Sequence, residues 1–255
     1  MSSITYQEFL SDQRLKDYIQ CYWYFRIDTK QVKHFDILPD ACFDLLIILK
    51  GGQIIDSGLT GIWSKSATVT YDENTEVFGI RFTPLATRGL FQFNVKEFLD
   101  IRTDLDLREL KINPDELLNT LYGFPEFIVN HLDQHFLRML DKRNVDQRLL
   151  NSFKLIDASI GNLSVETVAN EVGLSCRQLY RLVNNMIGIG IKEYSKMVKF
   201  RHSIQNYHLN KSFYSNYYDQ SHFIRDVKYF TGKTPEQLNI LNNDRFVQYY
   251  DSSLY

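Results

Sequence analysis

The sequence predicts an α+β protein with a β-rich N-terminal domain, a helical connector and an all-α C-terminal domain. Short runs of aromatic and β-branched residues dominate the chain up to about residue 82, whereas apolar residues recur at helical spacing after Pro84. The charge also changes sign, because residues 1–150 hold 17 lysines and arginines against 22 acids, and residues 151–241 hold 11 against seven. With 255 residues the chain is long enough for two hydrophobic cores, and we place the boundary near residue 150.

Four strands are expected in the N-terminal domain, at residues 22–27, 43–49, 68–71 and 77–82. Gly51-Gly52 and Asp72-Glu73-Asn74 are turn sequences between them. In the last strand, alternation puts Arg81 on the face opposite to the phenylalanines.

Helices are expected from residue 113 onward. Asn113-Pro114 fits an N-cap followed by proline at the first helical position, and residues 126–141 and 145–160 have helical apolar spacing. The predicted order is therefore a β-rich sensor or dimerisation domain at 1–105, a helical connector at 106–149, a helical domain at 150–241 and a tail at 242–255.

The segment 164–185 is predicted to form two short helices around a turn. The first helix carries one apolar stripe at i, i+3, i+4 and i+7, made by Val165, Val168, Ala169 and Val172. Gly173 supplies a left-handed C-cap, and Ser175 with Gln178 three residues later is a capping-box pattern that begins the second helix. Together they make a helix-turn-helix.

The second of these helices has two distinct faces. Its predicted buried stripe is Leu179, Leu182, Val183 and Met186. Its outer face carries Arg177, Tyr180, Arg181 and Asn184. The DNA major groove admits one α-helix, and arginine can bridge the O6 and N7 acceptors of guanine, so we expect this face to read double-stranded DNA. The alternative is an ordinary solvated helix face.

A second copy of this pattern lies 44 residues further along the chain. The shift places Ser175 on Asp219, Leu179 on Phe223, Arg181 on Arg225, Val183 on Val227, Met186 on Phe230 and Gly188 on Gly232. The outer face of the second copy would carry Ser221, Arg225 and Lys228, with Gln220 beside them. Two such helices on one domain could enter successive segments of the major groove.

These segments resemble the AraC family of transcription regulators. The resemblance rests on Tyr218-Asp-Gln-Ser-His-Phe-Ile-Arg-Asp-Val-Lys with Thr231-Gly-Lys-Thr-Pro, and on Val168-Ala-Asn-Glu-Val-Gly-Leu-Ser-Cys-Arg-Gln-Leu-Tyr-Arg. It covers about residues 150–241 and implies a domain of two helix-turn-helix units joined by a long helix. The base contacts that it implies fall on Arg177, Tyr180, Arg181, Gln220, Ser221 and Arg225. Phosphate contacts are expected from Lys192, Lys196, Lys199 and Lys211.

One segment departs from the family pattern. Residues 208–218, where a support helix should precede the second recognition helix, are several residues shorter than in the family and have Asn216-Tyr217 at the turn instead of glycine. We therefore expect DNA binding to be led by the first unit. The alternative function is a protein-interaction regulator with a degenerate helix-turn-helix domain that does not bind DNA.

The N-terminal domain also resembles known sensor domains. Ile37-Leu-Pro-Asp-Ala-Cys-Phe-Asp-Leu-Leu and Gly79-Ile-Arg-Phe-Thr-Pro are similar to segments of degenerate cupin-like domains attached to some AraC-type regulators. The resemblance implies binding of a small-molecule effector or formation of a homodimer. Arg81 could hold a ligand carboxylate or serve as a structural ion-pair partner. Trp23, in an aromatic run at 22–25, could line a pocket with Trp63 or belong to the core.

An enzyme is not expected. A metal-dependent cupin needs a histidine and carboxylate cluster, and only His34 lies in the first 110 residues. His131 and His135 have a zinc-compatible spacing but no third ligand nearby, and Asp133 between them should point away. The cysteines, Cys21, Cys42 and Cys176, form no Cys-x-x-Cys pair. We expect no metal and no cofactor, and, without a signal peptide or membrane-length apolar run, a cytoplasmic protein.

Overall fold

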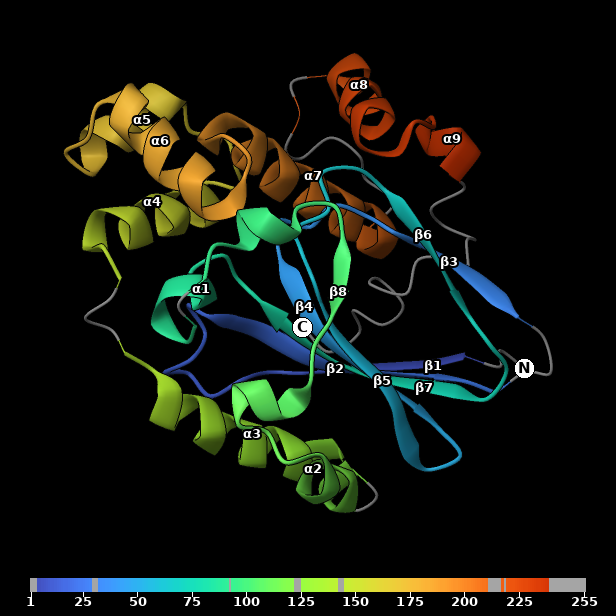
Figure 1. Cartoon of the computed structure of the whole chain (residues 1–255). Coiled ribbons are helices and arrows are strands. Elements are labelled where there is room, and N and C mark those ends of the chain that lie inside the picture. Colours follow the sequence, from blue (N-terminus) through green and yellow to red (C-terminus); the bar gives the residue numbers. More distant parts are fainter. Residues whose placement is uncertain are drawn as a thin grey trace.

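The fold is α+β, with strands in the first part of the chain and helices in the second (Figure 1). The computed structural model describes residues 4–28, 32–91, 93–121, 125–141, 145–210, 217 and 219–238. The N-terminal β-sheet region and the helical C-terminal region confirm the predicted order of secondary structure.

A six-stranded antiparallel sheet forms the centre of the N-terminal part. Its order is β1 (Ile4–Phe9), β2 (Ile19–Ile27), β7 (Thr75–Phe82), β4 (Phe43–Lys50), β5 (Gln53–Thr60) and β8 (Arg102–Asp104). The predicted strands at 22–27, 43–49 and 77–82 are β2, β4 and β7, which lie next to one another. Strands β1, β5 and β8 were not predicted.

A second sheet of two strands packs against one face of the first. It pairs β3 (Lys33–Ile37) with β6 (Ala67–Tyr71), the fourth predicted strand. Phe25 of β2 meets Phe35 of β3 edge to face, with the ring centroids 4.9 Å apart, and Tyr71 of β6 completes this small core. The described pairs leave β1 and β8 as edges of the large sheet, so they do not confirm the cupin-like barrel that the resemblance implied.

The predicted turns are present. Gly51 and Gly52 join β4 to β5 with φ of 57° and 81°, and Asn74 joins β6 to β7 with φ of 53°. These left-handed conformations favour glycine and asparagine, which is why the sequence shows the turns clearly.

Between β7 and residue 158 the described chain contains three short helical segments and three longer helices, which begin before the predicted connector at 106–149 and end after it. They are α1 (Ala86–Gly89), η1 (Val95–Phe98), η2 (Leu107–Leu110), α2 (Pro114–Leu121), α3 (Pro125–Met139) and α4 (Gln147–Ala158). Asn113 caps α2 as predicted, because its Oδ1 accepts the N–H of Asp115 at 3.0 Å. Helices α2 and α3 cover the sheet on the side away from the C-terminal helices (Figure 1).

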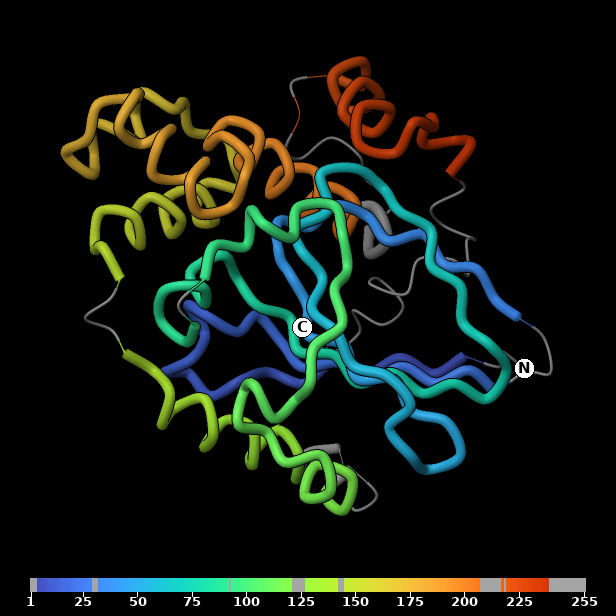
Figure 2. Tube along the Cα trace, in the orientation of Figure 1, coloured from blue at the N-terminus to red at the C-terminus, as the bar shows by residue number. Residues whose placement is uncertain are grey.

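In the described residues that follow, the C-terminal part contains five helices. They are α5 (Val165–Glu171), α6 (Cys176–Ile187), α7 (Ile191–Asn210), α8 (Gln220–Thr231) and α9 (Pro235–Leu238). Gly173 has φ of 68° between α5 and α6, so the predicted helix, turn and helix are confirmed. The chain path in Figure 2 shows this part lying along one side of the β-rich part.

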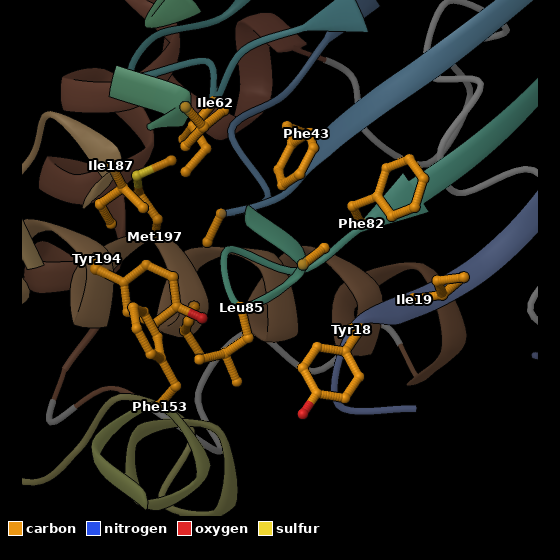
Figure 3. Packing of buried hydrophobic residues seen from close by; sticks show 14 of the residues in the cluster. Tyr18, Ile19, Phe43, Ile62, Phe82, Leu85, Phe153, Ile187, Tyr194 and Met197 are labelled. Carbon is orange, nitrogen blue, oxygen red and sulfur yellow. The ribbon is translucent and has the colours of Figure 1, made fainter. Parts of the chain in front are cut away.

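The hydrophobic core continues from the sheet into the C-terminal helices (Figure 3). Phe153 of α4 meets Tyr194 of α7 edge to face at 4.7 Å, beside Leu85 of the N-terminal part. Ile62 after β5 lies near Ile187 and Met197. Packing is therefore continuous across the boundary expected near residue 150, which stays a prediction. None of the helices in the described ranges is both long and apolar enough to span a bilayer.

Candidate nucleic-acid interface and ligand cavity

Helix α6 has capping residues at both of its ends, as the sequence predicts. The Ser175 hydroxyl accepts the N–H of Gln178, and the Gln178 side chain accepts the N–H of Ser175, which completes the predicted capping box. Gly188 ends the helix with φ of 82°. The predicted stripe is buried at Leu179, Val183 and Met186 and half-buried at Leu182.

Substitution of the capping residue Ser175 tests how much the cap of α6 contributes to the stability of the protein. A Ser175→Ala substitution is expected to lower the free energy of unfolding by about 1 kcal/mol, because it leaves an N–H of the first turn without its acceptor. Urea unfolding followed by circular dichroism measures the change. Ser175→Asp keeps an acceptor and should retain the stability, so an equal loss in both variants would contradict the assigned cap.

The outer face of α6 projects into solvent. Arg177, Tyr180 and Arg181 are exposed, and the edge of the Tyr180 ring lies against Gly190, where a Cβ would come within 2.7 Å of it. Asn184 is different, because it is half-buried and its Nδ2 donates to the carbonyl of Gly188 at 3.2 Å. Its amide thus helps to close the helix, and its predicted contact with DNA stays a prediction.

Helix α8 repeats α6 in detail. Both helices span 12 residues, and Asp219 caps α8 by accepting the N–H of His222 at 2.9 Å. Gly232 ends it with φ of 70°. The buried residues of α8 are Phe223, Val227 and Phe230, each 44 positions after a buried residue of α6. The internal repeat read from the sequence is therefore a structural repeat.

The outer face of α8 is exposed at all four predicted residues, Gln220, Ser221, Arg225 and Lys228. In the part of the chain that the structure describes, no carboxylate lies within 4.0 Å of Arg177, Arg181, Arg225 or Lys228. Four other exposed arginines do have such partners, whereas exposed Arg138 has none among the described residues: Arg14 pairs with Asp12, Arg26 with Asp28, Arg108 with Asp106 and Arg148 with Asp146. The two outer faces thus present unneutralised cations.

Helix α8 is supported by α7 and by Tyr217. Residues 208–210 belong to the end of α7, and 211–216 lie outside the described residues, so the predicted weakness of the support helix is not tested there. Phe230 of α8 packs on Phe200 of α7 with the centroids 4.8 Å apart, and Phe223 packs on Tyr217 at 5.4 Å. Helix α8 therefore has a buried anchor on α7.

The loop after β5, residues 61–66, provides a second anchor. The Ser66 N–H donates to the carbonyl of Phe230 at 2.7 Å. Lys65 Nζ donates to the carbonyl of Tyr229 at 2.7 Å and lies 3.0 Å from the centroid of its ring. Sequence periodicity could not reveal this contact, because the two segments are 164 positions apart.

The lysines of α7 are only partly available for phosphates. Lys192 is exposed and lines an open groove beside α6 with Arg177 and Tyr180. In contrast, Lys196 Nζ lies 5.1 Å from the ring centroid of Tyr229, and Lys199 Nζ lies 4.6 Å from that of Tyr217. Burial also lowers the pKa of Lys199. Lys211 lies outside the described residues.

A cavity of about 320 Å³ lies between the two sheets of the N-terminal part. Five aromatic side chains and four apolar ones form much of its wall, with Thr60, Thr70 and four charged residues between them. The aromatic residues are Tyr6, Trp23, Phe25, Trp63 and Tyr71, and the charged ones are Asp44, Asp56, Arg81 and Arg102. The aromatic run at 22–25 therefore divides, because Trp23 and Phe25 face the cavity whereas Tyr22 is buried in the main core.

Arg81 is surrounded by acids. Its Nε lies 3.2 Å from Asp40 Oδ2 and 3.3 Å from Asp44 Oδ1, and its Nη1 lies 3.9 Å from Glu8. Asp44 also accepts the indole N–H of Trp23 at 2.9 Å. Burial raises the pKa of Asp44 to about 6, against the opposing effect of Arg81. Of the two roles expected for Arg81, this geometry favours the structural ion-pair partner over a receptor for a ligand carboxylate.

The histidines of α3 are used in packing. His135 Nε2 contacts the carbonyl of Leu110 at 3.0 Å, and His131 Nε2 lies 3.6 Å from Glu116. Asp133 is buried and accepts the hydroxyl of Tyr22 at 2.8 Å, so it faces the sheet and not solvent. Within the described ranges, no three histidine, cysteine or acidic residues are grouped to hold a metal ion.

Comparison with known proteins covers both parts of the chain. A family model described as a domain of unknown function, DUF6597, matches residues 7–104. No curated protein sequence matches the chain. Similar solved structures are those of ToxT from Vibrio cholerae. A 1.65 Å structure is 14% identical, with 94% of this chain and 100% of that chain covered and a TM-score of 0.48. An apo variant is 11% identical, with 95% of this chain and 99% of that chain covered and a TM-score of 0.46. A wild-type form bound to an unsaturated fatty acid is 14% identical, with 83% of this chain and 95% of that chain covered and a TM-score of 0.43.

Proposed function

We propose that this chain is a cytoplasmic, non-enzymatic transcription regulator of the AraC type, which binds double-stranded DNA through α6 and α8. The observation that carries the proposal is the pair of matching helices whose exposed arginines and lysine have no carboxylate partner among the described residues. An exposed cation without an intramolecular partner keeps its full charge for a polyanion.

The chemistry of the outer faces suits the major groove. Arg177 and Arg181 lie one helical turn apart on α6, and a guanidinium can donate two parallel hydrogen bonds to guanine. Gln220 and Ser221 at the start of α8 offer neutral donors and acceptors, which can read adenine or contact phosphate. We therefore assign base reading to these exposed residues and phosphate contact to Lys192 and Lys228.

Helix α7 joins the two units, and α8 packs against its middle, because Phe230 meets Phe200 and the Tyr229 ring lies near Lys196. We propose that the two reading helices enter successive segments of the major groove, which are roughly 34 Å apart on B-DNA.

The cavity is the proposed effector site. Trp63 lines it and belongs to the same loop, 61–66, whose Lys65 and Ser66 hold the end of α8. A bound molecule that shifts Trp63 would therefore alter a direct contact with the second reading helix. This arrangement connects ligand binding to DNA binding without a long chain of intermediate residues.

Fluorescence anisotropy of a labelled random duplex tests the proposal. Four unpaired cations predict that the logarithm of the association constant falls with the logarithm of salt concentration with a slope of about −3 to −4, between about 50 and 200 mM salt. Selection of bound sequences from a random DNA pool should then recover a motif. Absence of binding at low salt would reject this function in favour of a protein-interaction regulator that does not bind DNA.

A further inference from the structure

We infer that the cavity between the two sheets binds a small organic cation, an ammonium group carried on an apolar or aromatic body. The inference rests on the proposed function for its regulatory meaning, because it names the class of effector. It stands on three features of the wall: the balance of charges, the available hydrogen-bonding groups and the aromatic surface.

The cavity wall holds two carboxylates, Asp44 and Asp56, and two arginines, Arg81 and Arg102, and further acids that do not line the cavity lie beside the arginines. Arg81 has three acids within 4.0 Å, Glu8, Asp40 and Asp44, and its side chain is only 7% exposed. One guanidinium cannot neutralise three carboxylates, so a negative excess remains at this end of the cavity. An entering anion would increase that excess, whereas an entering cation would reduce it.

The second arginine of the wall is neutralised in the same way. Arg102 Nη2 lies 2.7 Å from Asp56, and Nη1 lies 2.9 Å from Asp104. Three side-chain nitrogens of these arginines have no hydrogen bond within the described chain: Arg81 Nε, Arg102 Nε and Arg102 Nη2. Arg81 Nε and Arg102 Nη2 lie in ion pairs with carboxylates, whereas the charge of Arg102 is compensated through its Nη atoms and not through Nε. Neither arginine therefore offers an uncompensated charge to an acidic ligand.

The hydrogen-bonding groups of the wall point to the same class. The Trp23 indole donates to Asp44, the Tyr6 hydroxyl donates to Glu8, and the Thr60 hydroxyl contacts the carbonyl of Asp44 at 3.3 Å. These donors are occupied within the protein. A carboxylate can accept several hydrogen bonds, so Asp44 and Asp56 retain acceptor capacity for a ligand that brings its own donors.

The aromatic wall fits an organic cation better than an inorganic one. Tyr6, Trp23, Phe25, Trp63 and Tyr71 line one cavity, and the face of a tryptophan or tyrosine ring attracts an ammonium group. Leu46, Ile48 and Val69 add apolar surface for the rest of the molecule. The volume of about 320 Å³ lies at the small end of ligand sites, which limits the occupant to a small molecule.

Three probes of similar shape and different charge test the inference: 2-phenylethylamine, 2-phenylethanol and 3-phenylpropionate. Isothermal titration of the full chain at pH 7.5 should show the amine binding about tenfold or more tightly than the alcohol, and the acid binding more weakly than the alcohol. Binding of the acid as tight as that of the amine, or absence of binding by all three, would overturn the inference.

Two cavity variants and one control locate the binding. Asp44→Asn and Asp56→Asn each remove one carboxylate charge from the wall and should weaken amine binding about tenfold while the alcohol binds as before, which also shows that the cavity is intact. Glu171→Gln, at an exposed side chain of α5 that does not line the cavity, should change neither. Unchanged amine affinity in both cavity variants would overturn the inference. The titrations contain no DNA, so failure here is distinct from failure of the DNA-binding test.

Discussion

Replacement of both Arg177 and Arg181 by alanine is expected to weaken binding to the selected DNA sequence by about 2 to 6 kcal/mol, because each bidentate contact with guanine contributes about 1 to 3 kcal/mol of discrimination. Both guanidinium groups are exposed on the outer face of α6 and have no carboxylate partner in the described ranges. Their removal should leave the fold unchanged. Anisotropy titrations with the selected duplex and with a scrambled duplex measure the two affinities.

The scrambled duplex separates base reading from charge. Binding to it should fall by much less, since only the contribution of two positive charges is lost. Equal losses on both duplexes would show that these arginines contact phosphates alone. Arg14→Ala is the matched control, because Arg14 is equally exposed but is paired with Asp12 and lies far from the helix-turn-helix in the chain. It should bind both duplexes like the unmodified protein.

An Arg225→Ala, Lys228→Ala double variant compares the second unit with the first. The sequence led us to expect binding led by α6, because the segment before α8 is shorter than in the family. The structure gives α8 a buried anchor on Phe200 and backbone contacts from loop 61–66. We therefore expect a loss of specific binding of about 1 to 3 kcal/mol in this variant as well. An unchanged affinity would leave α6 as the sole reading helix.

Local signals in the sequence were sufficient for the helix-turn-helix. Ser175, Gly173 and Gly188 act within one or two turns of their own chain, so a cap or a left-handed residue can be recognised without knowing the fold. The same holds for the turns at Gly51 and Asn74. The central strands β2, β4 and β7 were found because their composition suits a sheet with neighbours on both sides.

The features that the sequence did not reveal depend on partners far along the chain. Strand β5 contains Asp56, Ser57 and Gly58, which have low strand propensity, and its strand conformation depends on pairing with β4 and β8. The acids around Arg81 come from two segments that are distant in the sequence, Glu8 from β1 and Asp40 with Asp44 from residues 40–44, and no local pattern unites them. Asn184 was assigned to the reading face by periodicity, yet its contact with Gly188 turns it toward the helix end.

Arg201 of α7 joins the helical part of the chain to the β-rich part, and its partners are also far away in the sequence. Its Nη1 donates to the carbonyl of Asp40 at 3.0 Å and to Gln20 Oε1 at 3.3 Å, and its Nη2 donates to Asp157 at 3.0 Å. Arg201 is 9% exposed. Asp40 also pairs with Arg81, so one short segment connects the wall of the cavity to the helix that joins the two reading units.

Arg201→Met is therefore expected to lower the free energy of unfolding by about 3 to 5 kcal/mol, because it removes three charge-assisted hydrogen bonds and leaves the buried carbonyl of Asp40 without this donor. Lys154→Met is the matched control. Lys154 forms an ion pair with Asp17 at 2.8 Å across the same interface, but its side chain is 49% exposed, so its substitution should lower the free energy of unfolding by at most about 1 kcal/mol.

Urea unfolding followed by circular dichroism and by the fluorescence of Trp23 and Trp63 measures both variants. The circular dichroism and fluorescence transitions should separate in Arg201→Met alone, since both tryptophans lie in the β-rich part. Equal, small effects of the two substitutions would mean that apolar packing, and not the buried guanidinium, holds the two parts together.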